Sequence, residues 1–209
     1  MILDEVMQWK AFEAEDGTIF DLSFLDAKKV TYTHSFAGKP DVSYDFWVTY
    51  SCHCFTKDYP DQSEAQRQAL AYVSPKETRP FCQQRYILAR QHLCQIVENL
   101  ASAEYTITDA GYGSYITAKV LTDDGETVWY HVPFRVYRER KKYRLHVLSA
   151  YPAPEGCGSG KSTSSKLPIT CGWANLCFPI PRNNKARLSG LRQNFFWYSE
   201  HLYRTWPDH

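Results

Sequence analysis

The chain of 209 residues lacks a long apolar run, and no stretch approaches the roughly 20 residues that a helix needs to cross a bilayer. Its opening segment, MILDEVMQWK, is too acidic and too poor in apolar residues for a secretory signal. Its seven cysteines are odd in number and lack the spacing of a disulfide framework. These absences predict a cytoplasmic protein with reduced, mostly buried thiols and no association with a membrane.

A strong net charge is also missing, since the formal value of +1 does not indicate a protein that coats a polyanion. The distribution of charge is more informative. Residues 1–26 contain seven acidic side chains and one basic one, whereas residues 135–144 contain six basic side chains and one acidic one. The basic segment could attract an anionic partner. A solvated loop would have the same composition.

The length and the aromatic content predict one packed domain, which can bury roughly 70% of its unfolded surface. We expect an α+β core domain over residues 1–151. Residues 152–209 then form a mobile loop, rich in Pro, Gly and Ser up to residue 166, and a C-terminal helical extension packed on the core. Within that extension, apolar residues at helical spacing predict a helix over residues 187–206.

The segment with the clearest pattern is 128–151, which alternates as a β-hairpin with a basic loop at 139–142. One register brings all apolar side chains to one face and the polar ones to the other, and a slip of one residue would mix them. The predicted pairs are Arg138–Tyr143, Tyr137–Arg144, Val136–Leu145, Arg135–His146 and Phe134–Val147.

The remaining segments predict a mixture of strands and helices. Alternation and turn residues indicate strands at 18–25, 29–36, 42–56, 105–108 and 114–122. A capping box begins a helix at Ser63, and an apolar stripe runs through a second helix over 80–100. The fold class that follows is α+β, with a single twisted, mainly antiparallel sheet packed by two or three helices and followed by the C-terminal extension.

Two motifs suggest chemistry that their context does not support. Residues 156–163 resemble a phosphate-binding loop, but Glu155 stands where the motif needs its first glycine, and no helix start follows. Cys52-His53-Cys54 suggests a metal site, yet on an alternating strand the two thiols would point away from His53. We therefore predict a flexible loop and buried thiols, with no metal and no cofactor.

The polar sheet face is the stronger candidate site. His53 projects from the strand at 42–56, and the hairpin adds His131, Arg135, Tyr137, Arg144 and His146 to its own polar face. If both faces align in one sheet, they bring together the groups that cleave RNA without a metal, which are imidazoles for proton transfer and guanidiniums for phosphate charge. Trp129 could stack an unpaired base, and Lys141 and Lys142 could attract the anion. A solvated polar face would explain the same pattern.

Two sequences together resemble a known group of proteins. The strand Tyr50-Ser51-Cys52-His53-Cys54-Phe55-Thr56 and the ending Leu148-Ser149-Ala150-Tyr151 resemble uncharacterised phage and plasmid proteins. The second sequence is also remotely similar to the last strand of RelE-like and barnase-like toxin ribonucleases. That resemblance implies catalytic roles for His53, Arg135, His146 and Tyr151. This chain is longer than those small toxins, which is a departure from the pattern of their families.

Two functions remain open from the sequence. The first is a toxin-like, metal-independent endoribonuclease of a mobile element, with RNA as its substrate and a cognate inhibitor as a further partner. The second is a non-catalytic phage or mobile-element protein that binds a host protein or nucleic acid through the basic hairpin. The sequence does not fix the oligomeric state.

Overall fold

The computed structural model describes residues 6–34, 38, 40–100, 106–109 and 114–153. These residues belong to the first of two compact units, Met1–Cys177, and the second unit, Phe178–His209, lies wholly outside them. The segment resembling a phosphate-binding loop, the C-terminal helix and nearly all of the extension 152–209 also lie outside the described residues. They remain predictions.

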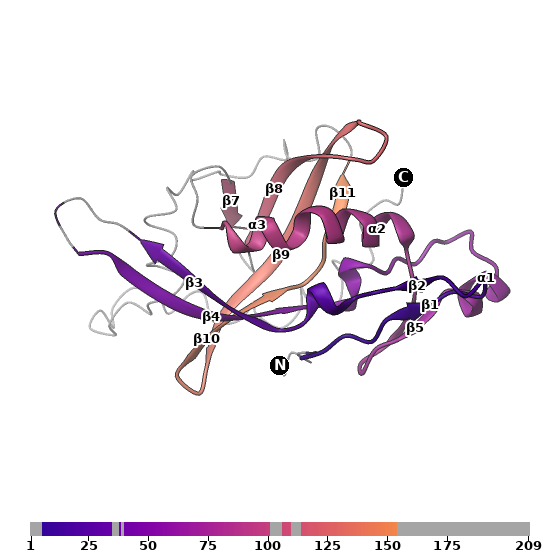
Figure 1. The fold of residues 1–209 in the computed structure, drawn as a ribbon, viewed down its shortest axis with the longest axis horizontal. Coiled ribbons are helices and arrows are strands. Elements are labelled where there is room, and N and C mark those ends of the chain that lie inside the picture. The colour runs from indigo at the N-terminus through magenta and orange to yellow at the C-terminus, as the bar shows by residue number, and fades with distance from the viewer. Residues whose placement is uncertain (1–5, 35–37, 39, 101–105, 110–113, 154–209) are drawn as a thin grey trace, which may run out of the picture. The chain divides into compact units, whose positions relative to one another are not determined.

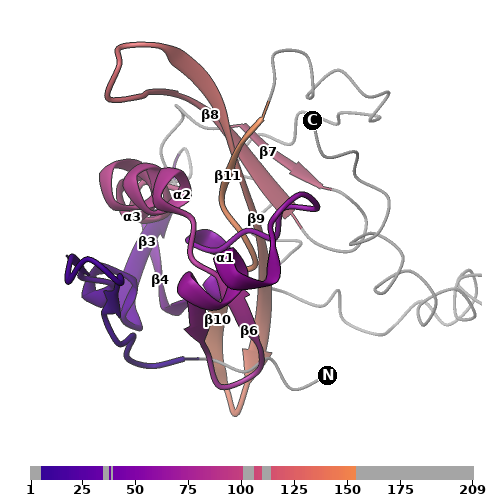
Figure 2. The same ribbon diagram turned by 90° about the vertical axis from the view of Figure 1, so that its right-hand side faces the viewer.

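Seven strands form one curled sheet (Figures 1 and 2). The order across the sheet is β3 (Lys28–His34), β4 (Val42–Tyr50), β10 (Lys142–Val147), β9 (Thr127–Glu139), β8 (Ser114–Leu121) and β7 (Thr106–Asp109), and β11 (Tyr151–Ala153) also pairs with β9. All neighbours are antiparallel except β4 and β10, which run parallel. The predicted α+β class with a mainly antiparallel sheet is confirmed.

One helical stretch lies against a face of this sheet (Figure 1). It consists of α2 (Gln83–Leu88), a π-helical turn η3 (Ala89–Leu93) and α3 (Cys94–Glu98), so it begins three residues later than predicted. Every residue of the predicted apolar stripe is buried: Cys82, Tyr86, Ala89, Leu93, Ile96 and Leu100. The Tyr32 hydroxyl on β3 donates to the Val97 carbonyl at 2.7 Å, which ties the sheet to α3.

The hairpin of β9 and β10 has the predicted register at every pair. Its loop is shorter than predicted, because Glu139 pairs with Lys142 and only Arg140 and Lys141 remain unpaired between the strands. Both loop residues have positive φ, 45° and 68°, as a type I′ turn requires. This turn matches the twist of the two strands, although neither residue is one that favours the conformation.

The second arm of the hairpin is interrupted before it reaches residue 151. Val147 pairs with Phe134, whereas Tyr151 of β11 pairs with His131, so one extra residue is inserted between β10 and β11. This bulge bends the chain and moves Tyr151 to the face that holds His131. The two rings stack there at 5.8 Å.

Two predicted strands are shorter in the structure because their ends form 3-10 turns. The strand at 42–56 stops at Tyr50, and η2 (Cys52–Cys54) follows, since the Ser51 hydroxyl accepts a hydrogen bond from the His53 N–H. The strand at 18–25 reduces to β2 (Ile19–Phe20), which pairs with β1 (Phe12–Glu13), and then turns into η1 (Ser23–Leu25). Alternation alone does not reveal these turns.

An aromatic part of the hydrophobic core fixes the segment after β4. The short α1 (Glu64–Ala69), which has the predicted capping box, leads into the hairpin of β5 (Ala71–Val73) and β6 (Thr78–Pro80). Phe55 is fully buried and contacts Trp9 at 5.2 Å and Tyr72 at 4.9 Å. Phe55 therefore anchors η2 against the N-terminal segment and the β5–β6 hairpin.

None of the helices in the described part of the chain is long and apolar enough to cross a membrane.

Candidate functional site

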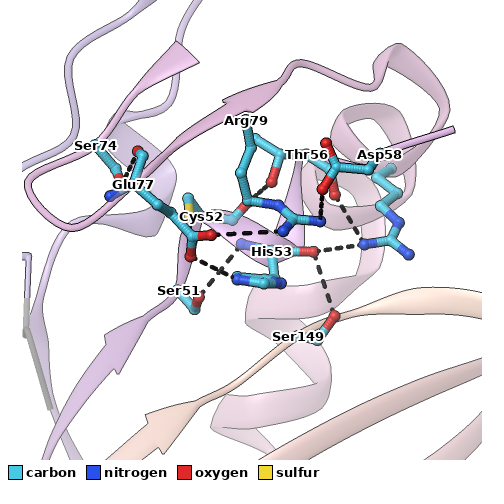
Figure 3. Close-up of polar contacts among 10 residues, drawn as sticks. Ser51, Cys52, His53, Thr56, Asp58, Ser74, Glu77, Arg79 and Ser149 are labelled. Carbon is cyan, nitrogen blue, oxygen red and sulfur yellow. Dashed lines mark hydrogen bonds and ion pairs between the residues drawn. The ribbon is translucent and has the colours of Figure 1, made fainter. Parts of the chain in front are cut away.

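The candidate site lies where the two parallel strands end. The Ser51 N–H still donates to the Val147 carbonyl at 2.9 Å, and then β4 continues into η2 while β10 continues toward β11. The Ser149 hydroxyl donates to the His53 carbonyl at 3.3 Å and links the two departing segments (Figure 3). The carboxyl ends of adjacent parallel strands are a common place for ligand sites. We call Cys52, His53, Glu77, Arg79 and Arg85 the seam site.

Glu77 reaches the seam site from the turn between β5 and β6. The Ser74 N–H and hydroxyl both donate to the Glu77 carbonyl, at 2.9 and 2.7 Å, and the Ser74 hydroxyl accepts from the Glu77 N–H. Pro75 follows Ser74, so the sequence suits a tight turn that begins with Ser and Pro. The turn is held in place because Lys57 N–H donates to the Pro80 carbonyl at 3.0 Å, next to the anchored η2.

His53 and Glu77 form the central contact of the site. The His53 Nε2 lies 2.8 Å from the Glu77 Oε1, and the His53 side chain is 15% exposed (Figure 3). Burial and the positive charges of Arg79 and Arg85 lower the pKa of His53, and the contact with Glu77 opposes only part of this effect. Burial would raise the pKa of Glu77, but the hydrogen bond from His53 and the charge of Arg79 lower it overall.

These two pKa shifts do not describe an ion pair, which would raise the pKa of the imidazole. They describe a neutral imidazole that donates Nε2–H to a charged carboxylate. The hydrogen bond selects the tautomer, so Nδ1 is the basic nitrogen of His53. A carboxylate that orients a neutral histidine in this way is the arrangement that general bases use.

Two arginines surround this pair. Arg79 contacts Asp58 at 2.7 Å and Glu77 at 3.5 Å. Arg85 donates through Nη1 to the carbonyls of His53 and Thr56, at 3.0 and 2.8 Å. The site therefore places two guanidiniums beside a neutral base, of which Arg79 is paired with Asp58 and Glu77. Arg85 fixes the backbone that presents His53.

The prediction that Cys52 and His53 point to opposite faces of a strand was wrong, because the two residues lie in a 3-10 turn. In the 3-10 turn, the Cys52 Sγ lies 3.8 Å from the same Glu77 oxygen that His53 contacts. Burial and the charge of Glu77 raise the pKa of Cys52, so the group is a thiol. Cys54 is fully buried in the core, and burial raises its pKa strongly. All four described cysteines, Cys52, Cys54, Cys82 and Cys94, are free.

His146 lies on the polar face, as predicted, but deep within it. Its Nδ1 contacts the Thr49 hydroxyl at 2.9 Å, and only 4% of the residue is exposed. Burial, followed by the charges of Lys76, Arg135 and His53, lowers the pKa of His146 to about 4. His53 and Arg135 are therefore both close enough to His146 to influence its protonation.

The predicted alignment of the polar faces is present in the sheet. His146 pairs with Thr49 and Arg144 with Trp47 across the parallel strands, while Arg135 and Tyr137 face them from β9. Arg144 lies 3.4 Å from the Glu139 carboxylate, toward the loop.

Tyr151, His131 and Trp129 lie at the other end of β9. Tyr151 and His131 stack, and the His131 Nδ1 contacts the Thr117 hydroxyl at 3.2 Å. Burial lowers the pKa of His131. The Arg85 guanidinium lies 5.6 Å from the centre of the Tyr151 ring, which connects this aromatic stack to the seam site. Trp129 is covered by Lys119 at 4.8 Å.

Lys141 and Lys142 do not lie in the seam site. They are exposed at the loop of the hairpin, and Lys142 is five residues along β10 from Val147, a distance of about 17 Å. We call residues 138–142 the hairpin tip. The sequence analysis grouped the hairpin tip with His131 and His146 because all belong to one hairpin. In the structure, the length of β10 separates the tip from the seam site.

Sequence reasoning missed five charged residues around the site: Lys76, Glu77 and Arg79 of the β5–β6 hairpin, Asp58 after η2, and Arg85 of α2. The Ser74-Pro75 sequence is typical of a tight turn and could have predicted that Glu77 lies in one. Its approach to His53 depends on the aromatic core around Phe55, which no local pattern specifies.

Comparison with known proteins identifies the family. Residues 9–172 match the YjaZ family. The chain is 52% identical over 151 residues to "Protein YjaZ" of Escherichia coli (strain K12), which covers 72% of this chain and 83% of that protein. No solved structure matches. The resemblance to phage, plasmid and toxin-like proteins was wrong, because seven-residue and four-residue matches are too short to specify a family. The chain belongs to the YjaZ family.

Proposed function

We propose that this protein is a metal-independent ribonuclease in which His53, oriented by Glu77, transfers protons. The observation that carries the proposal is the 2.8 Å contact between His53 Nε2 and Glu77 Oε1 beside two arginines. Cleavage of RNA without a metal requires a neutral base at ordinary pH and positive charge near the phosphate. The lowered pKa of His53 and the surrounding cations meet both requirements.

The reaction assigns a role to each group. His53 Nδ1 accepts the proton of a ribose 2′-hydroxyl, and the 2′-oxygen then attacks the adjacent phosphorus. The bond from phosphorus to the 5′-oxygen breaks, and that oxygen takes a proton from the Tyr151 hydroxyl, which leaves a 2′,3′-cyclic phosphate. Proton transfer from His53 back to Tyr151 through water restores both groups. We assign the proton donor to Tyr151, whose ring centre lies 5.6 Å from the Arg85 guanidinium that donates to the His53 carbonyl.

Positive charge for the phosphate comes from Arg135, with Lys76 and Arg79 nearby. The charges of Lys76 and Arg135 both act on His146, and Arg135 pairs with His146 across β9 and β10. Arg144 is less suited to this role, because it lies beside Glu139 toward the hairpin tip. Arginine stabilises the charge of a pentavalent phosphorus without changing its own protonation.

His146 has a positioning role in this proposal. Its burial, its contact with Thr49 and its pKa of about 4 keep it neutral and away from solvent. We propose that His146 holds β4 and β10 together just before the two strands separate at the seam site. Of the remaining predicted residues, Tyr137 and Trp129 would contact unpaired bases along β9, where aromatic side chains stack bases of any sequence. His131 is buried and stacks on Tyr151, so in this proposal it supports that ring.

The test is incubation of the purified full chain with single-stranded RNAs of varied sequence in EDTA. The expected result is cleavage products that end in a cyclic phosphate, and cleavage should be lost in His53→Ala. Intact RNA across a range of sequences, with the protein folded, would overturn the proposal. The same proposal places the protein in the cytoplasm, where RNA is present and where its free thiols remain reduced.

A second candidate is a non-catalytic binding protein, favoured by the exposed cations of the hairpin tip. Arg138, Arg140, Lys141 and Lys142 surround a single acidic residue, Glu139, on a two-stranded projection. Such a tip suits an acidic protein surface or nucleic acid. A co-purifying partner whose affinity does not change in His53→Ala or His146→Ala, but falls when the tip is neutralised, would favour this function. The family assignment removes the reason for expecting a mobile-element origin or a cognate inhibitor.

A further inference from the structure

The seam site also has the donor set of a metal centre. Cys52 Sγ, a ring nitrogen of His53 and a Glu77 carboxylate oxygen all lie within 4.8 Å of one another. Sulfur, imidazole nitrogen and carboxylate oxygen are the three donor types that zinc binds. Elsewhere in the described residues, no other group of three such side chains converges in this way.

The distances are close to those that a bound ion would impose. Zinc bonds of about 2.0–2.3 Å at tetrahedral angles separate neighbouring donors by about 3.4–3.7 Å. The Sγ–Oε1 separation of 3.8 Å is near this value, and the Nε2–Oε1 separation of 2.8 Å must increase by several tenths of an ångström. Glu77 can supply that change, because it belongs to a turn and its side chain is 34% exposed.

The charges of the site also permit an ion. A divalent cation with the thiolate of Cys52 and the carboxylate of Glu77 has no net charge. Arg79 lies 2.7 Å from Asp58, so it still has a carboxylate partner when Glu77 binds the ion. Arg85 is directed at backbone carbonyls and does not contact the three donors through any of its hydrogen bonds described above.

We propose that Cys52, His53 and Glu77 form a binding site for Zn²⁺, with the fourth position open to water or a ligand. On binding, Cys52 releases its thiol proton and His53 moves its ring proton from Nε2 to Nδ1, while Glu77 binds as the carboxylate that it already is. Three protein donors and one open position are the pattern of exchangeable or reactive zinc sites.

This inference goes beyond the proposed function and does not depend on it. The ion would occupy the ring nitrogen and the carboxylate oxygen that form the His53–Glu77 hydrogen bond, and His53 would then no longer present Nδ1 as a base. Bound zinc and metal-independent cleavage therefore exclude one another at this site, so zinc would act as an inhibitor of cleavage. Binding is measured without RNA, so either proposal can fail alone.

The test is titration of the metal-free full chain with CoCl₂ under reducing conditions, followed by ZnCl₂. Cobalt bound to a thiolate gives a near-ultraviolet charge-transfer band, which zinc removes by displacement. We expect one equivalent of cobalt, no band in Cys52→Ser, and a dissociation constant raised roughly tenfold or more in Glu77→Gln. Far-ultraviolet circular dichroism verifies that each variant is folded.

Two matched controls show whether the band comes from Cys52 or from another cysteine. Cys94→Ser, whose Sγ in the parent contacts the Phe24 carbonyl at 3.1 Å, should leave the band unchanged. So should the combined replacement of Cys157, Cys171 and Cys177 by serine. The inference is overturned if the parent gives no band, if the band persists in Cys52→Ser, or if it is lost in either control. If Cys52→Ser does not fold, Glu77→Gln becomes the deciding variant. Unchanged cobalt affinity in Glu77→Gln would also overturn the proposed zinc site.

Discussion

The hairpin tip and the seam site both contain clustered basic residues, yet their surroundings differ. At the tip, Arg140, Lys141 and Lys142 are exposed, so water screens their charges. At the seam, burial and neighbouring cations lower the pKa of His53, and the same two causes lower the pKa of nearby His146 on β10. Exposed charge attracts a partner from a distance, whereas buried charge determines which groups hold protons. We therefore expect changes at the seam to alter the cleavage chemistry, and changes at the tip to alter attraction or stability without altering that chemistry.

The largest expected effect is the loss of RNA cleavage when the seam pair is removed. His53→Ala should lower the cleavage rate by about 10²–10⁴-fold, since a general base contributes about that much. Glu77→Gln should also lower it, because the amide can donate to the ring and select the wrong tautomer. The measurement is the initial rate on single-stranded RNA in EDTA.

The matched control for that loss is His92→Ala. His92 lies on the π-helical turn and its Nε2 is 2.8 Å from the Leu121 carbonyl, so it is a histidine outside the seam. Its replacement should leave the cleavage rate unchanged. Equal losses in His53→Ala and His92→Ala would mean that the seam has no special role.

A smaller effect concerns the pH dependence of stability at His146. Its folded pKa of about 4 lies below the unfolded value of about 6.5, so the unfolded chain binds the proton first as the pH falls. Stability is therefore complete above pH 6.5 and decreases toward pH 4. Between pH 7 and pH 4.5 the loss from this group is about 2–3 kcal/mol.

Urea unfolding of the parent and of His146→Gln at the two pH values isolates that contribution. Carboxylates titrate in both proteins, so the difference between them reports His146. The variant should lose about 2–3 kcal/mol less than the parent on acidification. Identical pH dependence in the two proteins would show that His146 is not buried as described.

At the tip, a change of the turn residues should raise stability without changing cleavage. Arg140 and Lys141 have φ values of 45° and 68°, which non-glycine residues adopt at a cost. The double replacement Arg140→Asn and Lys141→Gly supplies the preferred residues of a type I′ turn, and we expect about 1 kcal/mol of added stability. Thermal unfolding measures the gain, and a lower melting temperature would refute the turn assignment.

The smallest effect is on attraction of RNA. Lys141→Gln with Lys142→Gln removes two exposed charges, so the affinity for single-stranded RNA should fall a few-fold and its dependence on salt should become less steep by roughly 1–2 units of log–log slope. The cleavage rate at saturating RNA should not change. A large loss of that rate would move the catalytic role from the seam to the tip.

The same comparison shows how much the sequence could predict. The register of β9 and β10 follows from alternation and one turn, both of which are local, and it was predicted at each pair. The apolar stripe of the long helix, from Cys82 to Leu100, was predicted for the same reason. His146 and Arg135 were therefore correctly placed on one face.

The seam could not be predicted in this way, because it depends on contacts between distant segments. Alternation continued through Cys52-His53-Cys54 and hid the 3-10 turn, which the Ser51 hydroxyl and the anchoring of Phe55 produce. Glu77 reaches His53 only because the β5–β6 hairpin packs on that aromatic core. A parallel pairing of β4 with β10 has no sequence signal of its own.

The most direct test of the central claim uses a DNA oligonucleotide with a single ribonucleotide, incubated with the full chain in EDTA. A base at His53 that acts on a 2′-hydroxyl predicts one cut, on the 3′ side of the ribose, with a 2′,3′-cyclic phosphate and a 5′-hydroxyl as products. His53→Ala should leave the oligonucleotide intact, whereas His92→Ala should cut it normally. An uncut oligonucleotide, or a cut whose products lack the cyclic phosphate, would contradict the proposed role of the seam site.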